Sequence, residues 1–520
     1  MCARLVLALV AALQQPQQPA PKTPPKKVVI RPYTPPKLLP EPAPEPSEVK
    51  VVEARPTGDQ PDALVMVRPW VSQMVGAVQR GARVPVRGQL LAKSAHGCPS
   101  RLWYALEPFG WICSHEVKAV NQPPSTESVL KVVEGQVVPF RYVMVGVKAD
   151  TFLPMWASLE DLKAGAEPER QLKRGDTVAV RPKLEHVGAT AYYMAVDDKM
   201  VPVSGTFELR DFSHWHGEVI DDKTVLPFGW VTPEKANVLD APAGKKIDQI
   251  DRRARVQIVE EQKVRNRRWL RIGEGRWLSA DAVNEVRKIA RPKGTGENPQ
   301  WFDLDLGEQV VVAYEGEKPV YATMVSSGRE PNHTPRGNYP IWGKVSAITM
   351  KSQEYDDVPY YVNKVPWVLF FQAHNALHGA YWHDRFGVTK SHGCANLAPL
   401  DARHLFEWMR PALPPGWTGL RFGDLTQPPV VHVHNSRLRP ELIQERNIGP
   451  PDKNDEAERL SDAVARREAK EREQEMLQQQ GAPGTPGASA APGAPGAPGS
   501  PAAPSTPAPA PAPPPPPQPH

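Results

Sequence analysis

The chain is poor in cysteine and has only one long apolar run. It contains 4 cysteines in 520 residues, which excludes a small fold held together mainly by disulfides. The apolar run, residues 5–13 (LVLALVAAL), is too short to span a bilayer comfortably, and no other segment is apolar enough to cross one. Charge of either sign is not in large excess, since the net charge is +5. This balance gives no indication of a nucleic-acid partner.

The N-terminus is typical of a secretory signal peptide. Arg4 precedes the apolar run, and the segment is predicted as a signal peptide over residues 1–13. We therefore expect an exported protein of the periplasm or cell envelope, with no transmembrane segment beyond the signal peptide. In an oxidising compartment Cys98 and Cys113, which are close in sequence, could form a disulfide, and the sequence leaves this open. Once Cys2 is removed with the predicted signal peptide, three cysteines remain, and Cys394 is then the odd one, as expected for a reactive thiol.

Proline is abundant, and its distribution divides the chain. The 61 prolines are about twice average usage and concentrate in residues 14–61 and 482–519. Such segments favour extended, unpacked chain, so both ends are expected to be unfolded and the middle folded. The predicted segments are a signal peptide (1–13), a Pro-rich linker (14–61), a small β-barrel module (62–121), a divergent β module (126–232), a second small β-barrel module (237–290), a catalytic domain (296–425), a charged helix (452–480) and a disordered Gly/Ala/Pro tail (481–520).

Two segments upstream of the catalytic domain repeat one pattern. Residues 101–117 (RLWYALEPFGWICSHEV) and 267–283 (RRWLRIGEGRWLSADAV) each have a tryptophan-containing strand, a glycine turn, a second tryptophan and a short acidic-ended piece. The pattern resembles the bacterial Src-homology-three-like module, a small barrel common in cell-wall proteins. Residues 126–232 are interpreted as an enlarged member of the series. The tryptophans either line a groove that binds the cell-wall polymer or fill the small cores; they are Trp103, Trp111, Trp269 and Trp277.

The segment that carries chemistry is residues 374–397 (HNALHGAYWHDRFGVTKSHGCANL). A thiol attacks a carbonyl only as its thiolate, and an imidazole that takes the proton completes a Cys–His couple able to form a thioester. Glycine at 393 permits a tight turn that aims backbone N–H groups at the developing oxyanion. Downstream, residues 399–411 (PLDARHLFEWMRP) have the apolar periodicity of a helix that Pro411 stops.

These residues resemble the signature of the L,D-transpeptidase catalytic domain (YkuD type). The signature begins with the pair His378-Gly379 and ends with Ser391-His392-Gly393-Cys394. Residues 379–390 separate His378 from Ser391. Further pieces of the family pattern appear in the same order along the chain. They are residues 304–319 (LDLGEQVVVAYEGEKP), 325–328 (VSSG) and 334–337 (TPRG), followed by Tyr339, Ile341 and Lys344.

The resemblance implies a role for each site residue. Cys394 would attack the carbonyl of a diaminopimelate-type residue in a peptidoglycan stem peptide and expel a terminal D-amino acid. His378 would be the general base, and the backbone N–H groups at Gly393 and Cys394, with His392, would hold the oxyanion. The residues assigned to loop bracing and substrate binding are Ser391, Asn396, Gly379, Tyr381 and Trp382. Many family members have arginine where Asn396 stands, so recognition of the substrate carboxylate is expected to differ here.

Other readings of these residues stay open. His374, His378, His383, His392 and Cys394 offer enough ligands for zinc, although their spacing fits no HExxH, finger or ribbon. His374 itself is expected on a strand. A non-catalytic wall-binding protein with a relict fold is the alternative to an enzyme. Within the enzyme class, crosslinking, carboxypeptidase and protein-anchoring activities share the same acylation step, and the sequence does not separate them.

The expected fold is mainly β. A β-sandwich-like catalytic domain follows two or three small barrels, and both ends are disordered. The mechanism requires neither a metal nor an organic cofactor, and the expected partners are peptidoglycan stem peptides and the cell-wall polymer.

Overall fold

The computed structural model describes residues 42–58, 60–69, 73–329, 332–352, 360–422 and 427–438. The chain divides into two compact units, residues 1–453 and 454–520, and every described residue belongs to the first. The predicted signal peptide (1–13), charged helix (452–480) and tail (481–520) lie outside the described residues. No helix in the described ranges is both long and apolar enough to cross a membrane.

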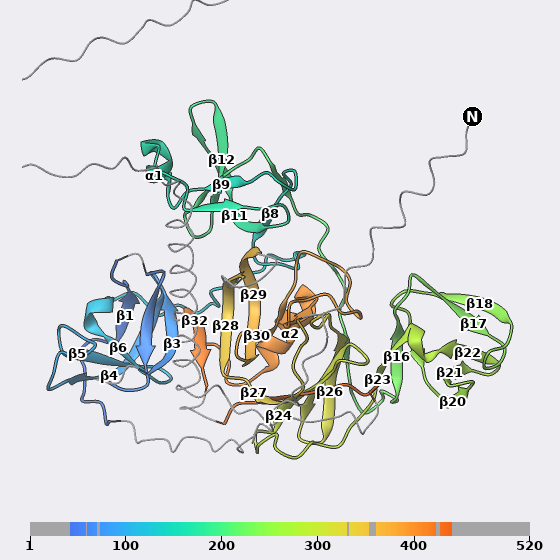
Figure 1. The fold of residues 1–520 in the computed structure, drawn as a ribbon. Helices are drawn as coiled ribbons and strands as arrows, with labels where there is room; N and C mark the ends of the chain where they lie inside the picture. Colours follow the sequence, from blue (N-terminus) through green and yellow to red (C-terminus); the bar gives the residue numbers. More distant parts are fainter. Residues whose placement is uncertain are drawn as a thin grey trace, which may run out of the picture. The chain divides into compact units, whose positions relative to one another are not determined.

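The described part of the chain is mainly β, as predicted, with 33 strands and two α-helices (Figure 1). The first region begins earlier than expected. Residues 51–54, assigned to the Pro-rich linker, form a strand that pairs with two others, because Val52 and Ala54 alternate with half-exposed residues and bury one face. Its strands are β1 (Val51–Ala54), β2 (Asp62–Met66), β3 (Met74–Gln79), β4 (Arg83–Leu91), β5 (Leu102–Leu106), β6 (Trp111–Cys113) and β7 (Val117–Ala119).

The middle region carries the short helix α1 and a set of antiparallel strands. Strand β11 pairs antiparallel with β8 and β12, and it meets the catalytic region through one parallel contact, Thr177↔Val362. The elements are β8 (Arg141–Val145), β9 (Leu153–Met155), α1 (Leu159–Ala164), β10 (Arg170–Leu172), β11 (Thr177–Val187), β12 (Thr190–Ala195), β13 (Met200–Pro202) and β14 (Thr206–Glu208).

The third region receives a strand that the sequence placed in the middle one. Residues 228–231 form β16, which pairs with β19 and β23 of the third region. The elements are β15 (Glu218–Val219), β16 (Phe228–Val231), β17 (Lys235–Leu239), β18 (Lys246–Asp251), β19 (Arg255–Gln257), β20 (Glu260–Val264), β21 (Arg267–Gly273), β22 (Arg276–Ser279) and β23 (Val283–Val286).

The repeated sequence pattern produces repeated structure. In the first region β5 and β6 form a hairpin that a 3-10 turn (Ser114–Glu116) joins to β7, and in the third region β21 and β22 form a hairpin that a 3-10 turn (Ala280–Ala282) joins to β23. All four repeat tryptophans are less than 10% exposed. Trp103 and Trp111 belong to a buried cluster of the first region, whereas Trp269 and Trp277 lie on the strand face opposite the core residues Leu270 and Leu278. Closed barrels are not shown, since β3 of the first region continues by pairing with β32 of the catalytic region.

The catalytic region consists of two sheets and one helix. A six-stranded sheet has the order β15-β26-β25-β24-β33-β27, and a second group of strands pairs as β32-β28-β29-β30-β31. The elements are β24 (Gln300–Asp305), β25 (Val310–Glu315), β26 (Lys318–Met324), β27 (Gly337–Pro340), β28 (Gly343–Lys351), β29 (Tyr361–Gln372), β30 (Asn375–Gly379), β31 (Ala395–Leu397), α2 (Pro399–Trp408), β32 (Trp417–Arg421) and β33 (Val430–His434).

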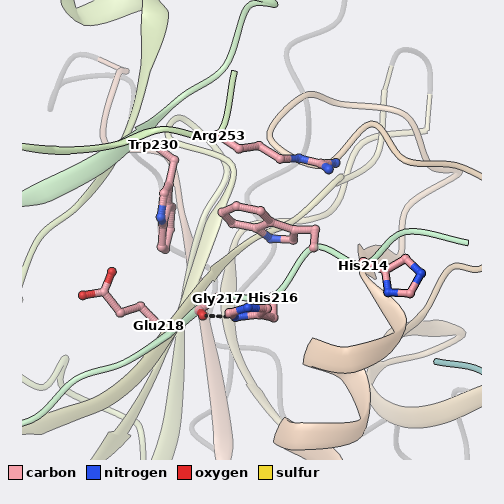
Figure 2. A pocket seen from close by; sticks show the side chains of 7 residues that line it. His214, His216, Gly217, Glu218, Trp230 and Arg253 are labelled. Carbon is pink, nitrogen blue, oxygen red and sulfur yellow. Dashed lines mark hydrogen bonds between the residues drawn. The ribbon is translucent and has the colours of Figure 1, made fainter. Parts of the chain in front are cut away.

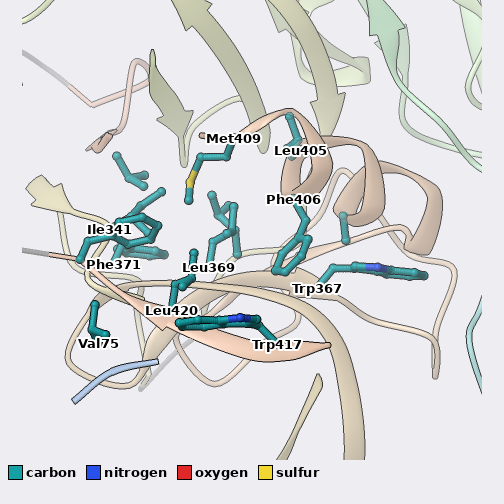
Figure 3. Packing of buried hydrophobic residues seen from close by; sticks show 14 of the residues in the cluster. Val75, Ile341, Trp367, Leu369, Phe371, Leu405, Phe406, Met409, Trp417 and Leu420 are labelled. Carbon is teal, nitrogen blue, oxygen red and sulfur yellow. The ribbon is translucent and has the colours of Figure 1, made fainter. Parts of the chain in front are cut away.

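One hydrophobic core joins both sheets and the helix α2. Phe302 contributes from the first sheet, Ile341 from the link between β27 and β28, Leu369 from the second sheet, and Leu405 and Phe406 from α2, as Figure 3 shows in part. Burial of such side chains contributes roughly 1.5–3 kcal/mol each. The core fixes α2 against β29 and β30, the strand that carries His378.

Both ends of α2 are held by buried ionisable side chains. At the C-terminal end Nζ of Lys344 donates to the carbonyl of Met409 at 2.7 Å, and burial lowers the pKa of this amine to about 7. In the first turn Asp401 is fully buried and accepts hydrogen bonds from the Gly217 N–H at 2.7 Å and the Tyr321 hydroxyl at 2.6 Å. Asp401 thereby anchors the segment that leads into β15.

Candidate active site

Of the two central residues of the predicted site, His378 lies on β30 and Cys394 immediately precedes the neighbouring parallel strand β31. β30 and β31 pair with the register Leu377↔Ala395 and His378↔Asn396. Side chains alternate between the two faces of a strand, so His378 and Asn396 share one face. Continued by one residue, the same register sets Cys394 opposite Ala376, whose backbone hydrogen-bonds the thiol. Cys394 and His378 are therefore diagonal neighbours on one face of the strand pair.

The His378 imidazole is buried, and its Nδ1 has no hydrogen-bond partner among the described residues. The backbone at Gly379 interacts with the ring and raises its pKa, because this interaction stabilises the protonated form. Burial is the larger influence and lowers the pKa of His378 to about 4. The ring is neutral at pH 7.

The Cys394 thiol is the free cysteine of the described chain, and it is half-buried. Its sulfur lies 3.8 Å from the carbonyl of His374. Burial raises the pKa of the thiol to about 11, and the backbone hydrogen bond from Ala376 opposes this rise. Because the pKa of the imidazole is lowered and that of the thiol is raised, the resting pair is a neutral thiol and a neutral imidazole.

The turn before Cys394 requires glycine for two reasons. Gly393 has φ = 118°, which an L side chain rarely adopts, and a Cβ there would lie 2.5 Å from Oδ1 of Asn375. Its N–H donates to the Ser391 hydroxyl at 3.1 Å, and that hydroxyl donates to the carbonyl of Cys394. The N–H predicted to stabilise an oxyanion is therefore already engaged within the turn.

The segment 326–328 clamps this turn from the side. Ser326 and Asn396 exchange both backbone hydrogen bonds at 2.9 Å, and the Ser327 carbonyl accepts from the N–H of Ser391 at 3.0 Å. The Thr334 hydroxyl accepts from the Gly328 N–H at 2.9 Å and donates to the Gly393 carbonyl at 2.8 Å. Three separated pieces of the predicted signature thus meet at one turn.

Gly328 allows the closest of these approaches. A Cβ at Gly328 would lie 2.9 Å from the Cα of Gly393 and 2.7 Å from the nitrogen of Thr334. This contact gives a physical reason for glycine at the end of the VSSG piece.

The other predicted site residues have varied surroundings. The Asn396 amide lies 3.0 Å from Nε2 of His383. His392 is exposed and stacks on Tyr360, with ring centroids 5.3 Å apart. The Tyr381 hydroxyl is buried between Thr177 and the carbonyl of Asn363, each at 2.7–2.8 Å.

Trp382 stacks on His378, with centroids 5.8 Å apart, and is partly buried. It covers one face of the imidazole. Gly379 is buried next to Pro366 and Trp367. The substrate-binding roles assigned to Gly379, Tyr381 and Trp382 stay predictions.

His374 lies in the exposed turn between β29 and β30, so its expected position on a strand is wrong; only two residues separate these strands.

The zinc alternative was built on five residues. In the described ranges they form no group of three or more ligand atoms within 4.8 Å of one another. The residues concerned are His374, His378, His383, His392 and Cys394.

Sequence reasoning missed two arginines that brace the loop between His378 and Cys394. The guanidinium groups of Arg252 and Arg253, which follow β18, donate to the carbonyl of Asp384 at 2.9 and 3.1 Å, and Arg253 also pairs with the Asp384 carboxylate. Asp384 is adjacent to His383, which contacts Asn396. No local signal in the sequence links residue 253 to residue 384, so only the folded chain reveals this brace.

A cavity of about 470 Å³ lies beside the Arg253 brace (Figure 2). The Arg253 guanidinium stacks over Trp215 at 5.4 Å, and Trp215 meets Trp230 edge to face. The lining residues are His214, Trp215, His216, Gly217, Glu218, Trp230 and Arg253. Neither Cys394 nor His378 lines it, so the cavity is separate from the Cys–His pair.

Comparison with known proteins identifies the fold that this geometry belongs to. Residues 299–430 match the YkuD family, described as the L,D-transpeptidase catalytic domain. The chain therefore contains a YkuD-type L,D-transpeptidase catalytic domain at residues 299–430. No curated protein matches the chain.

Solved structures of the same class are similar to this chain. An Enterococcus faecium L,D-transpeptidase is 20% identical, with 29% of this chain and 55% of that chain covered and a TM-score of 0.22. A Stackebrandtia nassauensis L,D-transpeptidase is 25% identical, with 27% and 58% covered and a TM-score of 0.20. An E. faecium catalytic domain acylated by ertapenem is 23% identical, with 24% and 98% covered and a TM-score of 0.21. The match thus spans only about half of the longer E. faecium protein.

Proposed function

We propose that this protein is a cysteine-dependent L,D-transpeptidase that acts on peptidoglycan stem peptides. The observation that supports the proposal most is the register of β30 and β31, which, continued by one residue, brings Cys394 to the face that carries His378, whose Nδ1 has no hydrogen-bond partner among the described residues. The family match over residues 299–430 supports the reaction class.

In the proposed mechanism Cys394 gives up its proton as it attacks. The Sγ–C bond forms at the carbonyl of a diaminopimelate-type residue while Nδ1 of His378 takes the thiol proton. The C–N bond to the terminal D-amino acid then breaks, and His378 returns the proton to the leaving amine. An amine of a neighbouring stem attacks the thioester and forms a crosslink, or water attacks it and releases the shortened stem.

The neutral resting pair suits this order of events. A preformed thiolate is scarce when the thiol pKa is about 11, so proton transfer must accompany attack. The Gly393 N–H would serve the oxyanion by exchanging its 3.1 Å bond to Ser391 for one to the substrate. His392, exposed at the same turn, is proposed as a further donor, and Asn396 as the group that braces the loop.

We further propose that the upstream sheets are Src-homology-three-like barrels that dock the enzyme on the wall polymer. The repeated order of hairpin, 3-10 turn and strand supports this. The cluster that contains Trp103 and Trp111 favours core packing for these two over a tryptophan-lined groove. An extracytoplasmic location is supported by the cell-wall enzyme family and by the Cys98–Cys113 disulfide.

Covalent labelling tests the proposal directly. The full chain is incubated with ertapenem, and intact-mass spectrometry is expected to show one adduct per chain, with peptide mapping to Cys394. Cys394→Ala is expected to abolish the adduct, whereas His186→Gln, on an exposed part of β11, is expected to keep it. A folded wild-type chain that forms no adduct would instead favour a non-catalytic wall-binding protein.

Digestion of purified sacculi with the chain then separates the activities. Diaminopimelate-linked dimers indicate crosslinking, and accumulation of tripeptides alone indicates hydrolysis.

A further inference from the structure

A cluster of side chains that can bind a metal ion lies in the domain at residues 299–430, apart from Cys394. Asp303 on β24 and His432 on β33 are direct partners in a parallel pair, and His434 follows two residues later opposite Asp305. One donor atom from each of Asp303, His432 and His434 lies within 4.8 Å of the other two. Because residues alternate along a strand, these three share the face opposite Phe302 and Leu304, which belong to the main core.

The cluster is buried on most sides. Asp303 is 4% exposed and His432 5% exposed, while the His434 side chain keeps 17% exposure. A buried carboxylate beside two imidazoles has lost most of its hydration, which is costly unless a cation or donors replace the water. The partial exposure of His434 gives an ion a route from solvent.

The tautomer of His432 is fixed by its neighbours. The Asn338 amide nitrogen donates to the carbonyl of Lys293 at 2.9 Å, so the Asn338 oxygen faces His432, 2.6 Å from Nδ1. The Nδ1 of His432 therefore carries the proton and donates, which leaves Nε2 with its lone pair. Metal-binding histidines are commonly oriented in this way by a hydrogen bond from the other ring nitrogen.

The distances suit a small divalent ion with modest adjustment. Nε2 of His434 lies 2.8 Å from Oδ1 of Asp303. Bonds of about 2.0–2.2 Å from zinc to nitrogen and oxygen set tetrahedral ligands roughly 3.3 Å apart, so small side-chain rotations would admit the ion. Two histidines and one carboxylate suit zinc, iron or nickel better than calcium or magnesium, which prefer oxygen ligands.

We propose that Asp303, His432 and His434 bind one divalent transition-metal cation of the zinc type. The ion joins the first and last strands of the catalytic domain, which lie 129 residues apart at Asp303 and His432. Its role is to stabilise the pairing of β24 with β33. The site is independent of the proposed acyl transfer, which uses Cys394.

Zinc binding to the full chain tests this inference in a Cys394→Ala background, in which the thiol cannot contribute a ligand. After treatment with EDTA and dialysis, isothermal titration with Zn²⁺ is expected to show one tight equivalent, and the thermal midpoint is expected to rise on binding. His434→Gln and Asp303→Asn are each expected to weaken binding at least tenfold and to remove the shift. The matched control, His186→Gln, is expected to bind like the parent.

The variants must be compared in EDTA, where similar circular dichroism of parent and His434→Gln shows that the variant folds. Should a variant fail to fold, the visible spectrum of the Co²⁺-loaded parent tests the ligand set instead. The expected result is d–d bands without thiolate charge transfer, which indicate nitrogen and oxygen ligands in a low-coordinate site. Absence of a tight equivalent in the parent, or unchanged binding in both folded variants, would overturn the inference. Ertapenem labelling of the wild type is unaffected by this result, so the two proposals fail separately.

Discussion

Replacement of His378 by glutamine removes the proposed base while it keeps a polar side chain at this position. With a thiol pKa of about 11, only about one chain in 10⁴ carries a thiolate at pH 7, compared with about one in 100 at the ordinary value of 9.0. The chain therefore depends on a base during attack. General-base contributions are typically about 10²–10⁴-fold, and we expect the ertapenem acylation rate to fall by that factor in His378→Gln.

The pH dependence provides a sharper form of the same test. The base works only when His378 is neutral, and its pKa is lowered to about 4 by burial. Acylation is therefore expected to hold its rate from about pH 5 to pH 9 and to fall only below about pH 4–5. Rates are measured by stopped-flow fluorescence and quenched mass spectrometry, with thermal midpoints recorded at each pH to exclude unfolding.

Two outcomes would contradict this reasoning. If His378→Gln acylates within about threefold of the wild type, the imidazole is not the base. If the acidic limb lies at pH 6.5 or higher, or if ultraviolet titration finds a thiolate at neutral pH, the resting state is an ion pair. His186→Gln is the control for the loss of an exposed histidine and is expected to follow the wild-type profile.

Three further changes test the surroundings of the site. Gly393→Ala is expected to lower the unfolding free energy by roughly 1–3 kcal/mol and to slow acylation at least tenfold. The control is Gly188→Ala, at φ = 60° with nothing within 4 Å of an added Cβ, which is expected to affect stability alone. Equal acylation rates in both variants would refute this prediction. Arg253→Ala removes the brace on Asp384 and is expected to slow acylation about threefold. The thermal midpoint is expected to change little, since such partly exposed ion pairs contribute roughly 0–1 kcal/mol. An unchanged rate would show that acylation does not need the brace. Burial raises the pKa of Asp401 from 3.8 to about 6. The stability of the wild type relative to Asp401→Asn is therefore greatest below about pH 4 and is expected to fall by about 3 kcal/mol as the pH rises through 6. Urea unfolding that shows a pH-independent difference in stability would contradict this prediction.

Several features could be predicted from sequence because their causes are local. The run from His378 to Cys394 predicts the nucleophile and its base. The glycine before the cysteine and the short spacing to the histidine are local features that this chemistry requires. Helix α2 follows from apolar periodicity with Pro399 at its start and Pro411 just beyond its end. The tryptophan hairpins at 101–117 and 267–283 likewise predicted the repeated strands.

Other features depended on contacts between residues far apart in the chain. The Pro-rich composition around residues 42–61 concealed β1, which exists because β4 and β7 supply its partners. The brace of Arg253 on Asp384 and the burial of Asp401 against Gly217 connect regions that no periodicity relates.

The sequence by itself determined which residues could react, because reactivity follows from residue type and short spacing. Only the tertiary structure decided their state. The raised pKa of the Cys394 thiol and the lowered pKa of the His378 imidazole arise from burial. The grouping of Asp303 with His432 arises from strand pairing between residues more than a hundred positions apart. Desolvation and long-range register are properties of the packed chain, and no local stretch of sequence encodes them.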